Sequence, residues 1–163
     1  MIRRAVMVTL LAALVTPGAL ADHQNETLKG LRTADLCAPE VYAYLDEDRD
    51  DDFEVLLVNA LNRYSQAQTF TWGDDKTCTV ETSLVLSAYE EGRGSFVYML
   101  TLSLDLKDDT TVLVGGRRVK LVAPTIWQSS YYGRYASNFE DLASRDLRDL
   151  FSSFTGAWRG THP

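Results

Sequence analysis

The feature that most constrains the fold is a long stretch in which apolar and polar residues alternate. Between residues 79 and 89 the inward set is Val80, Thr82, Leu84, Leu86 and Ala88. After the turn-forming segment 90–94, the alternation returns at Phe96, Tyr98, Leu100, Leu102, Leu104 and Leu106. Successive side chains of a strand point to opposite faces, so a period of two is typical of a sheet with one buried face. The pattern predicts a long antiparallel hairpin over 79–106, with one face against a core.

Two other segments repeat with the period of a helix. The first is 52–65, whose apolar face consists of Phe53, Leu57, Ala60, Leu61 and Tyr64. Asp51 and Glu54, three residues apart, resemble the capping arrangement at a helix N-terminus. The second predicted helix is 138–158, whose apolar face consists of Phe139, Ala143, Leu147, Leu150, Phe151, Phe154 and Trp158.

The remaining segments complete a small mixed fold. The β-prone run from Val41 to Leu45 predicts a strand at 40–46, ahead of the first helix. Residues 107–127 hold one or two further strands, and their division stays open because the alternation breaks at Gly115 and Gly116. The predicted fold class is α+β, an antiparallel sheet of about four strands with two helices packed on one face, in the order β-α-β-β-β-α.

The first residues have the pattern of an export signal. Two arginines precede the apolar run 5–15, and Ala19-Leu20-Ala21 gives the small-x-small pattern that signal peptidase reads before Asp22. The run is shorter than the roughly 20 apolar residues of a membrane-spanning helix, although an uncleaved anchor or a buried helix is the alternative. We expect a cleaved signal peptide at 1–21 and a single domain at 22–163, with 22–35 loosely ordered and no membrane anchor after cleavage.

The charge balance restricts the partners of such a domain. The net charge of the chain is −7, and removal of Arg3 and Arg4 with the signal peptide makes it two units more negative. An acidic surface disfavours nucleic acid and anionic membranes. Within this acidic chain, Arg117, Arg118 and Lys120 form a local basic cluster, which is either a solvated turn or a contact for an anionic partner.

The cysteine pair indicates an oxidising compartment. In an exported chain, Cys37 and Cys78 are expected to form a disulfide, although two buried free thiols are an alternative. A metal site would need two more ligands, and the histidines, His23 and His162, lie at the two ends of the mature chain. We therefore expect no cofactor, and a periplasmic or secreted location.

An acidic run ahead of the first helix partly fits a calcium loop. Positions one, three, five and seven of the loop pattern are occupied by Asp46, Asp48, Asp50 and Asp52. The pattern fails at position six, which is Asp51 instead of glycine, and at position twelve, which is Leu57 instead of glutamate. A solvated helix cap is the favoured interpretation, and calcium binding is the weaker alternative.

The sequence favours binding over catalysis. Nucleophilic catalysis lacks a histidine base within the domain, and paired carboxylates acting on an envelope glycan are the alternative enzymatic hypothesis. A short segment between the last predicted strand and the last helix carries residue types enriched at interfaces, namely Tyr131, Tyr132, Arg134 and Tyr135. These residues either bind a partner or pack the strand end against the helix.

A resemblance adds an expectation about the setting. Thr125-x-Trp127, the turn at Gly133 and the helix from Asp141-Leu142 to Leu147-Arg148-Asp149-Leu150-Phe151 resemble small exported bacterial proteins of unknown function, as do Leu28-Lys29-Gly30-Leu31 and Tyr98. The order of elements is distantly similar to periplasmic accessory domains of envelope transport systems. This resemblance implies a non-catalytic binding or accessory module of the cell envelope, with an envelope protein as its partner.

Overall fold

The alternating stretch forms the two longest strands of the sheet. In the computed structural model, which describes residues 25–92, 94–135 and 139–162, β3 (Val80–Gly92) pairs antiparallel with β4 (Ser95–Leu106). Their even-numbered side chains from Val80 to Ala88 and from Tyr98 to Leu104 are buried. The hairpin predicted over 79–106 is therefore confirmed, with its inward face as expected.

The sheet is mixed, so the prediction of a purely antiparallel sheet was wrong. Its five strands have the order β2-β1-β3-β4-β7, and β1 (Glu40–Leu45) runs parallel to β3. The helix α2 (Asp51–Ala67) connects these two strands and returns the chain to the same end of the sheet. Such a crossover makes its two flanking strands parallel. The additional edge strand β2 (Asp48–Arg49) was not predicted, because it contains two residues.

The segment 107–127 contains two strands that lie outside the main sheet and the beginning of a third strand that belongs to it. β5 (Thr110–Val114) and β6 (Arg117–Leu121) form a separate two-stranded hairpin. Its turn is Gly115-Gly116, both at positive φ, a backbone conformation that glycine adopts without strain. β7 (Thr125–Tyr135) then returns to the main sheet beside β4. The candidate segment 131–135 therefore lies within a strand, and its predicted position between strand and helix was wrong.

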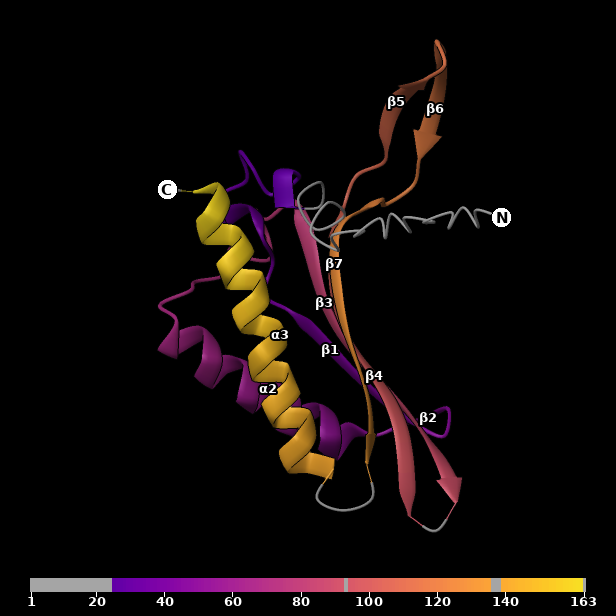
Figure 1. The fold of residues 1–163 in the computed structure, drawn as a ribbon. Helices are drawn as coiled ribbons and strands as arrows, with labels where there is room; N and C mark the ends of the chain where they lie inside the picture. The colour runs from indigo at the N-terminus through magenta and orange to yellow at the C-terminus, as the bar shows by residue number, and fades with distance from the viewer. Residues whose placement is uncertain (1–24, 93, 136–138, 163) are drawn as a thin grey trace, which may run out of the picture.

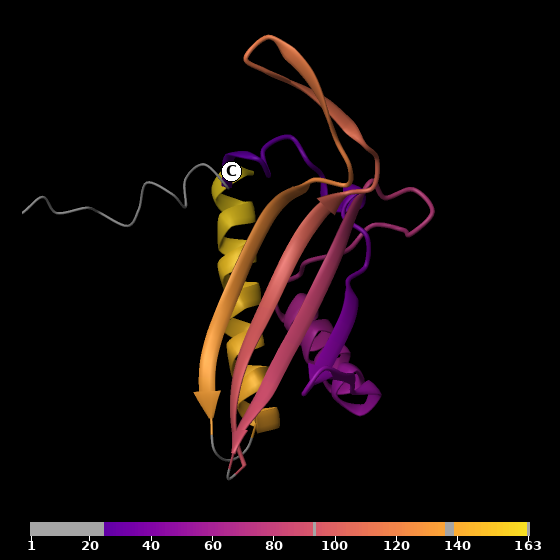
Figure 2. The same cartoon turned by 90° about the vertical axis from the view of Figure 1, so that its right-hand side faces the viewer.

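Both long helices cover one face of the sheet, as predicted. α2 and α3 (Phe139–Thr161) lie side by side on that face, and none of the described helices lies on the opposite face (Figures 1 and 2). The apolar face of α3 contributes large buried side chains to the core: Leu147, Leu150, Phe151, Phe154 and Trp158. Among the described residues, no helix combines the length and the hydropathy needed to cross a membrane.

The described part of the N-terminal segment packs against the domain. The expected signal peptide lies outside the described residues, but from Asn25 onward the chain lies against the domain, and Leu28 is fully buried. A short 3-10 helix, η1 (Thr33–Asp35), leads to Cys37, which forms the predicted disulfide with Cys78. Within 25–35, Leu28 is thus the residue that anchors the chain in the core.

Candidate functional site

One edge of the sheet is closed by side chains and turns. The outward-facing backbone of Ala43 in β1 is fully used, because its carbonyl accepts from Asp50 N at 2.9 Å and its N–H donates to Glu54 Oε1 at 3.2 Å. Arg49 donates twice to the Glu54 carboxylate, at 2.8 Å each. These hydrogen bonds from Arg49 hold the pKa of Glu54 below its ordinary value, against the effect of burial. The C-terminal half of β1 is thus unavailable to another strand.

The other edge is formed by β7, and the strand register fixes which of its backbone groups face outward. Leu106 N donates to Pro124 O, and Leu102 pairs with Ser129, so even-numbered residues of β4 face β7. Backbone groups alternate between the two sides of a strand. Those of the odd-numbered residues of β7 therefore face β4. The outward-facing residues are Gln128, Ser130, Tyr132 and Arg134.

These outward groups form an open strand edge. Thr27 Oγ1 donates to Ile126 O at 2.6 Å and closes the first position of the edge. Beyond it, the outward-facing backbone groups have no hydrogen-bond partner within the described parts of the chain; they belong to Gln128, Ser130, Tyr132 and Arg134. β7 is 11 residues long and contains neither proline nor lysine, which commonly protect edge strands. An unprotected edge of this length is a template for pairing with another chain.

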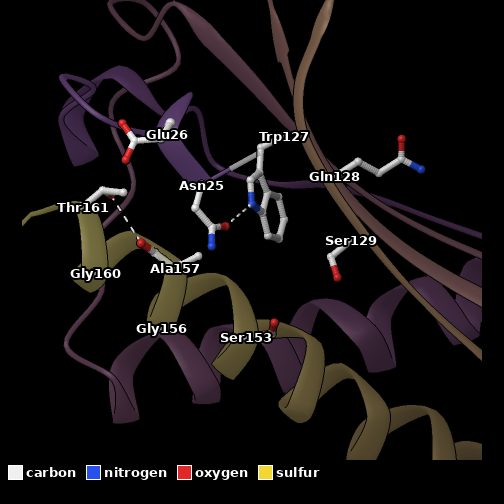
Figure 3. Close-up of a pocket in the computed structure, with 10 residues that line it drawn as sticks. All are labelled: Asn25, Glu26, Trp127, Gln128, Ser129, Ser153, Gly156, Ala157, Gly160 and Thr161. Carbon is white, nitrogen blue, oxygen red and sulfur yellow. Dashed lines mark hydrogen bonds between the residues drawn. The ribbon is translucent and has the colours of Figure 1, made fainter. Parts of the chain in front are cut away.

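A groove runs beside this edge, on the side that faces the helices (Figure 3). Its volume is about 600 Å³, and its wall on the strand side is formed by Trp127 and Ser129. Trp127 Nε1 donates to Asn25 Oδ1 at 3.4 Å, which ties the N-terminal segment to the wall. Figure 3 shows the Ser129 side chain directed toward the groove and the Gln128 side chain directed away from it.

The helix side of the groove consists of small residues. Ser153, Gly156, Ala157 and Gly160 lie along one side of α3, opposite Trp127. A Cβ added at Gly156 or Gly160 would meet no atom within 4 Å, so contacts within the domain do not require a glycine at either position. Glycine inside a helix is unfavourable relative to alanine. Here the absence of side chains leaves room beside the strand edge.

The four candidate binding residues divide between the two faces of the sheet. Because side chains alternate along a strand, Tyr131 and Tyr135 lie on the helix-facing side, whereas Tyr132 and Arg134 lie on the other. Tyr135 stacks on Phe96, while Tyr132 is 75% exposed. Arg134 forms an ion pair with Glu91 of β3. The four residues therefore form no single patch, but they flank the open edge on both sides.

Gly133 was noted only as a turn, and its place in β7 has a different cause. A Cβ at this position would lie 2.4 Å from the ring of Tyr98, which passes beneath the strand. The Tyr98 hydroxyl donates to Asp146 of α3, and burial together with this carboxylate raises the pKa of Tyr98 well above its ordinary value. This charge-assisted hydrogen bond holds α3 against the sheet.

The calcium-loop residues have separate local roles. Asp46 Oδ1 accepts from Glu90 N, and Asp50 Oδ1 accepts from Phe53 N as the N-cap of α2, each at 2.8 Å. Asp48 lies in β2, and Asp52 is exposed in the first turn of α2. Within the described ranges, no group of three or more histidine, cysteine, aspartate or glutamate side chains is arranged to hold a metal ion.

His162, near the end of the chain, packs against the folded body. Its ring stacks on Trp158 with centroids 4.3 Å apart, and its Nε2 lies 2.8 Å from Leu31 O. It thereby joins the end of α3 to the N-terminal segment. His23 lies outside the described residues.

Comparisons of the chain with protein-family models, with curated proteins and with solved structures find no match. A functional conclusion therefore rests on the geometry of the structure. Its most distinctive part is the juxtaposition of an open edge, from Gln128 to Arg134, with a groove lined by small residues of α3.

Proposed function

We propose that this protein is a non-catalytic binding module of the cell envelope that binds a partner protein by adding an extended segment of that partner to β7. The observation that carries the proposal is the open edge of β7 beside the groove along α3. In strand addition, backbone hydrogen bonds supply affinity, and pockets for alternate side chains supply specificity. At this edge, the outward backbone groups of β7 would supply the hydrogen bonds, and the groove along α3 would supply a pocket.

The added segment would contact the domain on both faces of the sheet. Every second side chain would enter the groove, between Trp127 and the small residues Gly156 and Gly160. The intervening side chains would lie beside Ser130 and the exposed ring of Tyr132. Tyrosine supplies a large contact area at a small cost in conformational entropy, which suits it to such a flank.

The envelope setting of the proposal is supported by the covalent structure. The Cys37–Cys78 disulfide is the type of bond that persists in oxidising compartments and is rare in the cytosol. The expected signal peptide at 1–21 agrees with the same location. The proposed partner is accordingly an envelope protein.

The proposal is tested by blocking the edge without disturbing the sheet. Gln128→Pro removes an outward N–H and leaves the bonds to β4 in place, whereas Gln128→Ala removes only the side chain. In affinity capture from an envelope fraction, the alanine variant should retain the partner and the proline variant should lose it. Equal capture by both variants, with equal thermal midpoints, would falsify strand addition at β7.

A second variant tests the groove independently. Gly156→Leu places a side chain into the open space and also replaces a helical glycine, so we expect unchanged or increased thermal stability together with lost capture. Val55→Leu, on an exposed position of α2, is the matched control and should bind as the wild type does. Binding by Gly156→Leu at wild-type strength would separate the groove from the function.

A further inference from the structure

The β5–β6 hairpin stands apart from the rest of the domain. It projects beyond the end of the main sheet, and among the described strands its two members pair only with each other (Figures 1 and 2). An isolated two-stranded hairpin is only marginally stable in water. Its projection is therefore not explained by a contribution to the core.

The hairpin exposes aliphatic side chains near its tip. Leu113 is 72% exposed and Val114 is 59% exposed, and both immediately precede the Gly115-Gly116 turn. Val119 and Val122 on the returning side are exposed as well. Clustered exposed apolar side chains indicate a surface that contacts a membrane or another molecule.

The same tip is cationic in an otherwise acidic protein. Residues 110–122 contain three basic side chains and no acidic one, whereas the chain as a whole has a net charge of −7. Lys120 pairs with Asp109, but Arg117 and Arg118 form no ion pair with any described carboxylate. In the register of the hairpin, Arg118 lies opposite Leu113, and Arg117 lies opposite Val114.

We propose that this hairpin docks the protein on the surface of an anionic lipid bilayer. Leu113 and Val114 enter the boundary between headgroups and acyl chains, while Arg117 and Arg118 contact lipid phosphates. Apolar burial and attraction between basic residues and anionic lipid act together at such surfaces. The basic tip is complementary in charge to anionic lipid, whereas the acidic body of the protein alone would be repelled by it.

The composition of the tip favours a bilayer over a protein partner. Anchors at protein interfaces are enriched in tryptophan, tyrosine and arginine, and leucine and valine are under-represented among them, so the arginines of the tip suit either partner and its aliphatic residues favour lipid. Residues 110–122 contain no aromatic side chain. The inference does not depend on strand addition at β7, and the residues that carry it are different.

The test is co-sedimentation with vesicles of phosphatidylcholine, with and without phosphatidylglycerol. The protein is purified without residues 1–21, whose apolar run would itself bind vesicles, and it retains every described residue. We expect binding that requires phosphatidylglycerol and weakens with added salt. Absence of binding to the anionic vesicles would overturn the proposal.

Variants assign this binding to the hairpin. Each arginine near an anionic surface is expected to contribute roughly a fivefold increase in partitioning, so Arg117→Gln with Arg118→Gln should weaken binding about thirtyfold. Arg63→Gln, at an exposed position of α2, is the control and should change little. An equal loss in the control and in the double variant would indicate general charge attraction and would contradict the hairpin assignment.

A second pair of variants tests the contribution of the aliphatic side chains of the hairpin. Val114→Ser should reduce binding to anionic vesicles, whereas Val55→Ser should not, although each valine is 59% exposed. All variants should keep the thermal midpoint of the wild type, since the altered side chains lie on the surface. Unchanged vesicle binding by the hairpin variants, with loss of a captured protein, would assign the tip to a protein partner instead and overturn the proposal.

Discussion

At the scale of single residues, Glu54 shows how one side chain closes a sheet edge. Its carboxylate accepts from the backbone of Ala43 and from the guanidinium of Arg49, although it is held on α2 and not on a strand. The sequence indicated Glu54 only as part of a helix cap. Its actual role depends on β1, which precedes it by a tight turn and brings the Ala43 N–H into reach.

This arrangement predicts an acid-dependent loss of stability. Because the pKa of Glu54 is lowered in the folded state, its stabilisation is present above the ordinary carboxyl value near pH 4.5 and is lost as the pH falls through the lower folded value. Glu54→Gln should therefore show a shallower decline of the thermal midpoint below this pH than the wild type. Glu47→Gln, in the exposed turn between β1 and β2, is the control and should follow the wild-type profile.

At the scale of elements, the two edges of one sheet differ in how their backbone groups are used. This difference should be visible in amide hydrogen exchange of the isolated protein. The amides of Ser130 and Tyr132, which face outward, should exchange at least about tenfold faster than those of Ser129 and Tyr131, which are bonded to β4. Equal protection of both sets would mean that another segment or another copy covers the edge.

Local patterns predicted the elements well, and their pairing less well. The 79–106 hairpin and both helices could be predicted because each buries one face. Their apolar residues therefore recur with a period of two in the strands and of 3.6 in the helices. The parallel pairing of β1 with β3 was not readable, because it joins residues some forty positions apart. The end of β7 was missed because tyrosines, serines and a glycine do not alternate in polarity.

The candidate site was predicted only in part. The tyrosine segment 131–135 was selected for its composition, and it does lie along the open edge. The groove could not be inferred, since it consists of small side chains from α3 that have no chemical signature in isolation. Whether an edge is open depends on which strand lies beside it, and that is a property of the assembled sheet.

At the scale of the whole molecule, the disulfide joins the two parallel strands at the same end. Cys37 precedes β1 and Cys78 precedes β3, with a sequence separation of 41 residues. Constraint of the unfolded chain by a loop of this length contributes about 4 kcal/mol. The Cys37→Ser and Cys78→Ser double variant should show a correspondingly lower denaturant midpoint in equilibrium unfolding. An unchanged midpoint would show that the disulfide does not contribute to the stability of the domain.

The difference between the β1 and β7 edges also determines at which side of the sheet another strand can add. A sheet with two open edges can add strands at both sides and grow without limit into a fibre. In this protein the Glu54 and Asp50 contacts close the C-terminal half of β1, so this part of the sheet offers no backbone groups to a further strand. Under the proposed strand addition, a partner segment would therefore pair at β7 and not beside the closed half of β1.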